Sequence, residues 1–206
     1  MTRTRRQVRR AEGGEAGRFM RVCGLVLAAG AGTRFGGPKG LARMPDGEPW
    51  VARAVRMLRD GGCDDVLVAV GARGDDVAAL VPGEAAVVSV PDWADGVSAG
   101  LRAGILAAGA SRADLLAITP VDTPEAPPEA LRRLLAVAEI SGGADALVQA
   151  VYSGRPGHPV LIGRGHWPDV AGALQGDRGA RPYLAAYGVI EVEASDLWSG
   201  SDVDER

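Results

Sequence analysis

The chain has 206 residues, of which 47% are hydrophobic but only 4% aromatic, so its core must be built from aliphatic side chains. That length suffices for one α/β domain with a sizeable core. The net charge of −3 argues against a nucleic-acid partner, and two cysteines give neither a disulfide framework nor a metal-ligand spacing. No apolar stretch reaches the roughly 18 residues that a membrane span requires, so we expect no membrane contact and a cytoplasmic location.

The N-terminal segment differs from the rest of the chain. Its first ten residues contain no acid and five arginines: Arg3, Arg5, Arg6, Arg9 and Arg10. Up to residue 19 the segment has no apolar run, no hydrophobic periodicity and no secretion signal. We therefore expect a disordered basic leader over residues 1–20 and a single domain over residues 21–206.

Beyond the leader, apolar runs alternate with amphipathic segments. Residues 22–28 are nearly all apolar, which is typical of a strand covered on both faces. Residues 50–59 place Val51, Val55 and Leu58 on one helical face and arginines on the other. In chain order we expect strands at 22–28, 66–70, 86–90, 115–119, 146–151, 159–162 and 189–192, and helices at 50–59, 75–80, 96–108, 128–140, 167–174 and 180–187.

This alternation predicts an α/β fold with a twisted, mainly parallel sheet and helices on both faces. Sheets of this kind bind ligands beyond the carboxyl ends of their strands. The residues that follow the expected strands are therefore the first candidates for a functional site.

A glycine-rich stretch follows the first expected strand, with the sequence AAGAGTRFGGPK from Ala28 to Lys39. Lys39 is the only lysine among 23 basic residues, which indicates a position where a compact ammonium is needed. Small residues let backbone N–H groups surround phosphate oxygens, and Arg34 and Lys39 would neutralise a triphosphate. Neither the Walker nor the dinucleotide spacing fits, so a glycine-rich turn without a ligand is the alternative.

The stretch LAAGAGTRFGGPK resembles the signature loop of MobA-like NTP transferases, most closely in their molybdenum cofactor cytidylyltransferase branch. The resemblance implies a three-layer, Rossmann-like fold of the nucleotide-diphospho-sugar transferase type. It also implies that the loop wraps a nucleoside triphosphate, with CTP favoured by Ala29 and Pro38. The nucleotide-binding residues that it implies in this loop are Leu27, Ala28, Ala29, Gly30, Gly32, Arg34 and Lys39.

Candidate metal ligands come from two acidic segments. Asp122 follows an expected strand directly, where a carboxylate is well placed to bind Mg²⁺, although a turn or cap role is the alternative. Its context, PVDTP, resembles the P-V-D-x-P motif of the family, whose acid binds the metal. The C-terminal SDVDER resembles the start of a second acidic motif of the family, which implies Asp202 or Asp204 as a further ligand.

Three other segments resemble substrate-binding parts of the family. DWADGVSAGLRAG implies that Ser98 approaches the base and ribose, whereas the residue itself is equally consistent with a helix cap. GRPGHPVLIGR implies that Arg155 and His158 bind the acceptor, with a turn role as the alternative for His158. QGDRGARPYL implies acceptor binding by Asp177 and Arg181, with pairing of Asp177 to Arg178 or Arg181 as the alternative.

The leading hypothesis is a Mg²⁺-dependent nucleotidyltransferase in which Arg34, Lys39 and Asp122 are catalytic. It would move CMP, or another nucleoside monophosphate, to a phosphorylated small-molecule acceptor such as molybdopterin and release pyrophosphate. A second hypothesis is an NADH- or NADPH-dependent oxidoreductase that reduces a quinone-like pigment such as nicotine blue. A third is a non-catalytic nucleotide-binding partner of a molybdoenzyme.

Overall fold

The computed structural model describes residues 20–204. The expected disordered leader, apart from Met20, lies outside the described residues. Among the described residues no helix combines the length and apolar character that crossing a membrane would need.

A seven-stranded sheet forms the centre of the molecule, with the strand order β3-β2-β1-β4-β6-β5-β7. Neighbouring strands are parallel except at β6, which is antiparallel to both β4 and β5. The expectation of a mainly parallel sheet is therefore confirmed. The strands are β1 (Val22–Ala28), β2 (Asp65–Val70), β3 (Ala86–Ser89), β4 (Leu115–Pro120), β5 (Leu147–Tyr152), β6 (Arg155–Gly163) and β7 (Ile190–Glu193).

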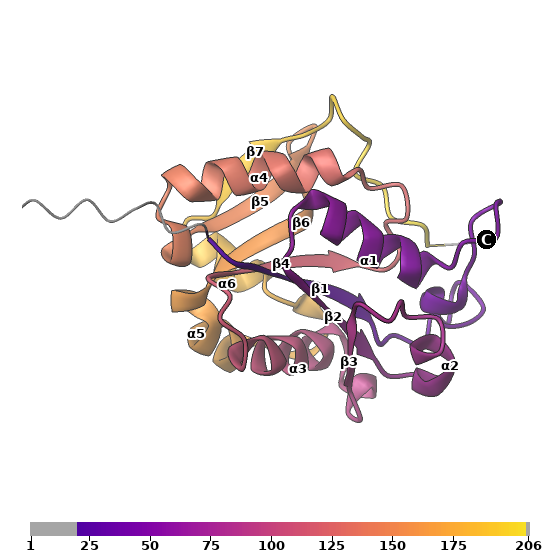
Figure 1. Cartoon of the computed structure of the whole chain (residues 1–206). Coiled ribbons are helices and arrows are strands. Elements are labelled where there is room, and N and C mark those ends of the chain that lie inside the picture. The colour runs from indigo at the N-terminus through magenta and orange to yellow at the C-terminus, as the bar shows by residue number, and fades with distance from the viewer. Residues whose placement is uncertain (1–19, 205–206) are drawn as a thin grey trace, which may run out of the picture.

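Helices cover both faces of the sheet, so the molecule has three layers (Figure 1). Helices α1 and α4 lie on one face, and α3, α5 and α6 lie on the other. Each face has its own buried cluster, made almost entirely of Ala, Val, Leu and Ile as the composition requires. The helices are α1 (Trp50–Gly61), α2 (Gly74–Ala78), α3 (Val97–Gly109), α4 (Pro128–Ile140), α5 (Trp167–Ala173) and α6 (Arg181–Ala186).

Most expected elements lie within a few residues of their predicted bounds, and β6 is the main exception. It begins at Arg155, whereas the sequence predicts a strand from residue 159. The residues Arg-Pro-Gly-His at its start do not have the apolar pattern of a buried strand. They nevertheless belong to it, because β6 forms a hairpin with β5 and pairs Arg155 with Tyr152.

The path of the chain creates a crevice at the carboxyl ends of the central strands β1 and β4. From β1 the chain continues to β2 and β3 on one side, and it then returns to β4 on the other side of β1. Ligands bind at such a switch point, beyond the carboxyl ends of the two diverging strands. The first residues of the antiparallel β6 and the last residues of β5 reach this same edge.

The segment after β7 returns to the same edge. It carries the last two predicted metal ligands, Asp202 and Asp204. The Val203 backbone N–H donates a hydrogen bond to the carbonyl oxygen of Asp122, at 2.9 Å. The C-terminal acids are thereby held beside the end of β4.

Candidate active site

A cavity of about 980 Å³ lies at the carboxyl edge of the sheet. Its lining comes from the glycine-rich loop, the start of α3, the end of β4, the start of β6, the segment before α6 and the C-terminal segment. The predicted site residues that line it are Leu27, Ala29, Gly30, Gly32, Arg34, Lys39, Asp122, His158, Asp177, Arg181, Asp202 and Asp204.

The glycine-rich loop doubles back on itself after β1. The Gly37 N–H donates a hydrogen bond to the Gly32 carbonyl oxygen at 3.0 Å. Gly32 has a φ of +58°, and a Cβ at this position would overlap the Gly37 carbonyl oxygen. Phe35 is buried and its ring packs on Trp50 with centroids 5.3 Å apart, which anchors the loop on α1. The short 3₁₀ helix η1 (Lys39–Leu41) then points Lys39 back toward β4.

Lys39 joins the loop to both acidic segments. Its Nζ donates a hydrogen bond to Asp122 Oδ2 at 2.8 Å and another to Asp204 Oδ1 at 2.9 Å. Burial alone would lower the pKa of Lys39, but the two carboxylates outweigh it and raise the pKa above its usual value. The Lys39 hydrogen bond and charge lower the pKa of Asp204. Lys39 is therefore an ammonium at neutral pH and partly neutralises the acids.

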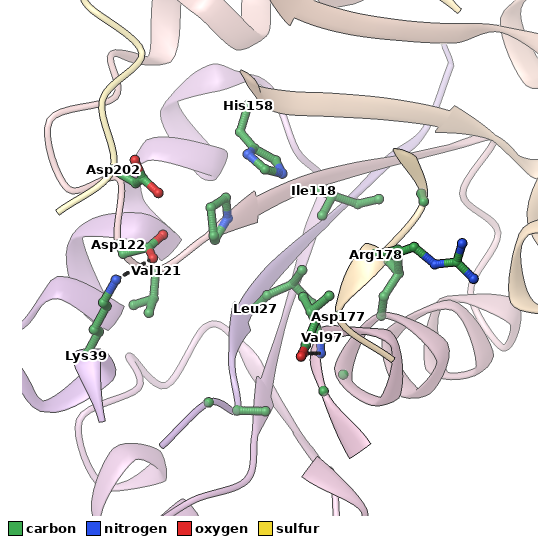
Figure 2. Close-up of a pocket in the computed structure, with 18 of the residues that line it drawn as sticks. Leu27, Lys39, Val97, Ile118, Val121, Asp122, His158, Asp177, Arg178 and Asp202 are labelled. Atoms are coloured by element: carbon green, nitrogen blue, oxygen red, sulfur yellow. Dashed lines mark hydrogen bonds and ion pairs between the residues drawn. The ribbon is translucent and has the colours of Figure 1, made fainter. Parts of the chain in front are cut away.

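Asp122, Asp202 and Asp204 form a carboxylate cluster in which one oxygen of each lies within 4.8 Å of the others. Carboxylates this close repel one another unless a cation compensates them. Oxygen ligands in this number and spacing suit a hard divalent cation such as Mg²⁺. The donor set therefore fits the predicted metal site. Figure 2 shows Lys39, Asp122 and Asp202 on one side of the pocket.

The other side of the pocket is built where Asp177 meets α3. In the 3₁₀ helix η5 (Gly176–Arg178), Asp177 Oδ1 accepts a hydrogen bond from the N–H of Val97, the first residue of α3, at 3.3 Å (Figure 2). Among the described residues Asp177 forms no ion pair with Arg178 or Arg181, so the alternative that predicted such a pair is wrong. Asp177 instead satisfies a free N–H group at a helix N-terminus, where a negative charge is favourable.

His158 lies at the start of β6 and lines the cavity. Its backbone carbonyl accepts a hydrogen bond from the Tyr152 hydroxyl at 2.7 Å. Burial lowers the pKa of His158 to about 4, so its imidazole is neutral near pH 7. A neutral imidazole can donate or accept a hydrogen bond but adds no charge to the pocket.

Three predicted site residues do not line the cavity. Ala28 is in the core on the opposite face from Leu27, because successive strand residues alternate, so only its backbone is available to a nucleotide. Arg155 is exposed at the outer end of β6. Ser98 is 2% exposed, and its Oγ has no hydrogen-bond partner among the described residues. The cap alternative for Ser98 is wrong, because Gly96 occupies the N-cap position of α3.

Sequence reasoning missed several lining residues. Gln149 is 9% exposed in β5, and its Nε2 donates a hydrogen bond to the Gly157 carbonyl at 3.1 Å. A lone amide within the apolar run ALVQAVY was a usable signal for a pocket residue. Val97, Ile118 and Leu184 form an apolar wall, and nothing distinguishes them in the sequence from ordinary core residues.

The curated relatives of the chain include proteins named for two different activities. It is 35% identical over 194 residues to nicotine blue oxidoreductase of Paenarthrobacter nicotinovorans, covering 89% of this chain and 92% of that protein. It is also 35% identical over 188 residues to molybdenum cofactor guanylyltransferase of Burkholderia cenocepacia, covering 86% of this chain and 88% of that protein.

Solved structures share the fold of the chain, and a family model matches most of its length. The crystal structure of Rv0371c from Mycobacterium tuberculosis superposes with a TM-score of 0.77 at 28% identity, covering 90% of this chain and 93% of that chain. The structure of its complex with manganese superposes with a TM-score of 0.72 at 25% identity, covering 89% of this chain and 94% of that chain. The model of the MobA-like NTP transferase domain matches residues 24–192. The chain belongs to the MobA-like NTP transferase family and is a nucleotidyltransferase.

Proposed function

We propose that the chain transfers a nucleoside monophosphate from a nucleoside triphosphate to a phosphorylated small-molecule acceptor, with molybdopterin as the leading candidate and Mg²⁺ as the cofactor. The observation that carries the proposal is the contact of Lys39 with both Asp122 and Asp204 at the mouth of the glycine-rich loop. This contact brings the ammonium of Lys39 and the carboxylate cluster together in one cavity, which supports a site for phosphate and a divalent cation. The acceptor follows from the name of the Burkholderia relative and from the sequence resemblance.

The loop and its two cations bind the triphosphate. Gly30 and Gly32 line the cavity, where small residues let backbone N–H groups approach phosphate oxygens, and Arg34 and Lys39 provide positive charge. Asp122, Asp202 and Asp204 hold Mg²⁺, which when bound supplies the positive charge that stabilises the phosphates in the transition state.

The acceptor enters from the β6 side of the cavity. Arg178 of η5 and Arg181 of α6 also line the cavity and can pair with a phosphate, while His158 and Gln149 provide neutral hydrogen-bonding groups. An oxygen of the acceptor phosphate attacks the α-phosphorus, the bond to the β-phosphate oxygen breaks, and pyrophosphate leaves. No covalent enzyme intermediate is needed, because such transfer depends on positioning and electrostatic stabilisation.

The proposal also concerns which nucleoside triphosphate is the donor. The glycine-rich loop favours CTP through Ala29 and Pro38, whereas the Burkholderia relative is named for guanylyl transfer. Both nucleotides therefore belong in the test.

The test measures pyrophosphate release by the full chain from CTP, GTP and ATP, with and without molybdopterin and with Mg²⁺, Mn²⁺ or EDTA. We expect release that requires both acceptor and divalent cation and that is lost in Asp122→Asn. Asp60→Asn, which removes an exposed carboxylate outside the cavity, should retain activity.

Absence of pyrophosphate release with every nucleotide would overturn the proposal. NADH or NADPH oxidation with a quinone acceptor under those conditions would instead support the activity named for the Paenarthrobacter relative.

A further inference from the structure

Strand β6 bulges where it passes the cavity. Gln149 of β5 pairs with Val160, but two positions later Val151 pairs with Pro156. One residue of β5 therefore faces three residues of β6, which are 157–159 and include His158. A bulge of this kind leaves backbone groups without ladder partners and changes the direction of a side chain. The carbonyls of this bulge need other donors.

Two side chains of β5 supply those donors. Gln149 Nε2 bonds the Gly157 carbonyl at 3.1 Å, and the Tyr152 hydroxyl bonds the His158 carbonyl at 2.7 Å. Gln149 and Tyr152 are three positions apart in the strand, so they lie on opposite faces of the sheet. The bulge that carries His158 is thus held from both faces.

The ring of Tyr152 also contacts the C-terminal segment 195–204, which we call the tail. Trp198 packs edge-on against it, with centroids 5.3 Å apart and an interplanar angle of 80°. Gly200, with a φ of +76°, lies so close that a Cβ there would overlap the Tyr152 ring. Past this contact the tail carries Asp202 and Asp204 to the carboxylate cluster.

Tyr152 is suited to hold both segments. It is 2% exposed, so its ring has little freedom to move. Burial raises the pKa of Tyr152 to about 12, and its hydroxyl therefore stays protonated and able to donate at physiological pH.

We propose that Tyr152 is a positioning residue that sets the His158 bulge and the acidic tail relative to each other, so that the acceptor side and the metal side of the cavity are assembled together. The link to the acceptor rests on the proposed function, whereas the link between Tyr152, His158 and the tail does not.

The first test is Tyr152→Phe, which removes the hydroxyl and keeps the ring. The chain has only two histidines, so the imidazole signals of His158 in an NMR spectrum have His166 as an internal reference. We expect the His158 signals to shift and those of His166 to stay. We also expect the KM for the acceptor to rise by up to about tenfold, as loss of one hydrogen bond implies, while kcat and the KM for the nucleotide stay unchanged. The control is Tyr187→Phe, because Tyr187 is 60% exposed and its ring contacts His166 rather than His158, so the His158 signals should stay.

The second test is Gly200→Ala, which pushes the tail against the ring. We expect it to shift the His158 signals in the wild-type background and to weaken Mn²⁺ binding measured by electron paramagnetic resonance. In the Tyr152→Phe background, Gly200→Ala should shift the His158 signals less, because the hydrogen bond from residue 152 to the His158 carbonyl is absent. If Gly200→Ala does not fold, Trp198→Leu perturbs the same contact without backbone strain.

Unchanged His158 signals in both single variants would overturn the proposal, as would an equal effect of Gly200→Ala in both backgrounds. The NMR results do not depend on turnover. A chain that shows these shifts but transfers no nucleotide would contradict the proposed function and leave the role of Tyr152 intact.

Discussion

At the scale of single residues, the ammonium of Lys39 can pair either with the carboxylate cluster or with a bound triphosphate, but not with both at once. Its ammonium now lies 2.8 Å from Asp122 and 2.9 Å from Asp204, within the same cluster that suits a divalent cation. A phosphate-binding role requires it to face the triphosphate instead. The side chains of Lys39 and Asp122 are only 14% and 21% exposed, so solvent screens their attraction weakly. Under the proposed function, Lys39 therefore competes with the metal for these carboxylates until a triphosphate draws it away.

Lys39→Met should expose this competition. We expect Mn²⁺ to bind at least about tenfold more tightly without nucleotide, because even 1.4 kcal/mol of lost competition changes affinity by that factor. Binding of the nucleoside triphosphate should weaken. Electron paramagnetic resonance of free Mn²⁺ and calorimetry with CTP or GTP measure the two effects.

Arg34→Met is the matched control, because Arg34 lines the cavity but makes no ion pair with the cluster among the described residues. It should weaken nucleotide binding and tighten Mn²⁺ binding far less than Lys39→Met does, because Arg34 acts on Asp204 only through its charge and not through a hydrogen bond. Unchanged or weaker Mn²⁺ binding in Lys39→Met would show that the ammonium does not compete.

At the scale of elements, the glycine-rich loop depends on one backbone conformation. Gly32 adopts a left-handed φ of +58°, and it has no room for a Cβ beside Gly37. The hydrogen bond between these glycines closes the loop and sets the path toward Lys39. The loop is consequently preformed for its ligand.

Gly32→Ala should open the loop. A left-handed non-glycine residue costs about 1–2 kcal/mol, and the overlap with Gly37 adds to that cost. We expect nucleotide affinity measured by calorimetry to fall by at least about tenfold, with a smaller loss of thermal stability. Gly83→Ala is the matched control, since Gly83 is a loop glycine with open space around it and no positive φ. Equal affinities for the two variants would contradict a preformed loop.

At the scale of the whole molecule, the two faces of the sheet have separate cores, and each contains one buried cysteine. Cys23 belongs to the core beneath α3, and Cys63 belongs to the core beneath α1. Burial raises the pKa of the Cys23 thiol to about 12 and also raises that of Cys63. Since the thiolate is the reactive form, both cysteines are protected in the folded chain.

A thiol reagent at pH 8 should therefore report on global unfolding. We expect the native chain to react slowly, with both cysteines reacting in one kinetic phase. The reason is that one sheet supports both cores, so the two cores should unfold together. In denaturant both should react at once. Two separate phases of one thiol each, recorded by absorbance, would show that the layers open independently.

Across these scales, what sequence could predict depends on how local the signal is. Apolar runs and turn residues predicted the elements, and the end of a strand predicted Asp122, because those signals lie within a few positions of the feature. The glycine-rich stretch and its single lysine predicted Lys39. Tyr152 has no local signal, because its role depends on a bulge between two strands, whereas Gln149 has one as a lone amide in an apolar run. The resemblance implied ligand-binding roles for Arg155 and Ser98, but neither lines the cavity. Arg155 is exposed at the start of a hairpin strand, and Ser98 lies on a buried face of α3.

The pairing of Lys39 with Asp204 also has a consequence for synthesis. The two residues are 165 positions apart, and Asp204 leaves the ribosome after every strand of the sheet. A nascent chain can complete the sheet, close the glycine-rich loop and expose Asp122 while Asp202 and Asp204 are still inside the exit tunnel. The carboxylate cluster can therefore form only after residues 202–204 emerge, later than the sheet that positions Asp122.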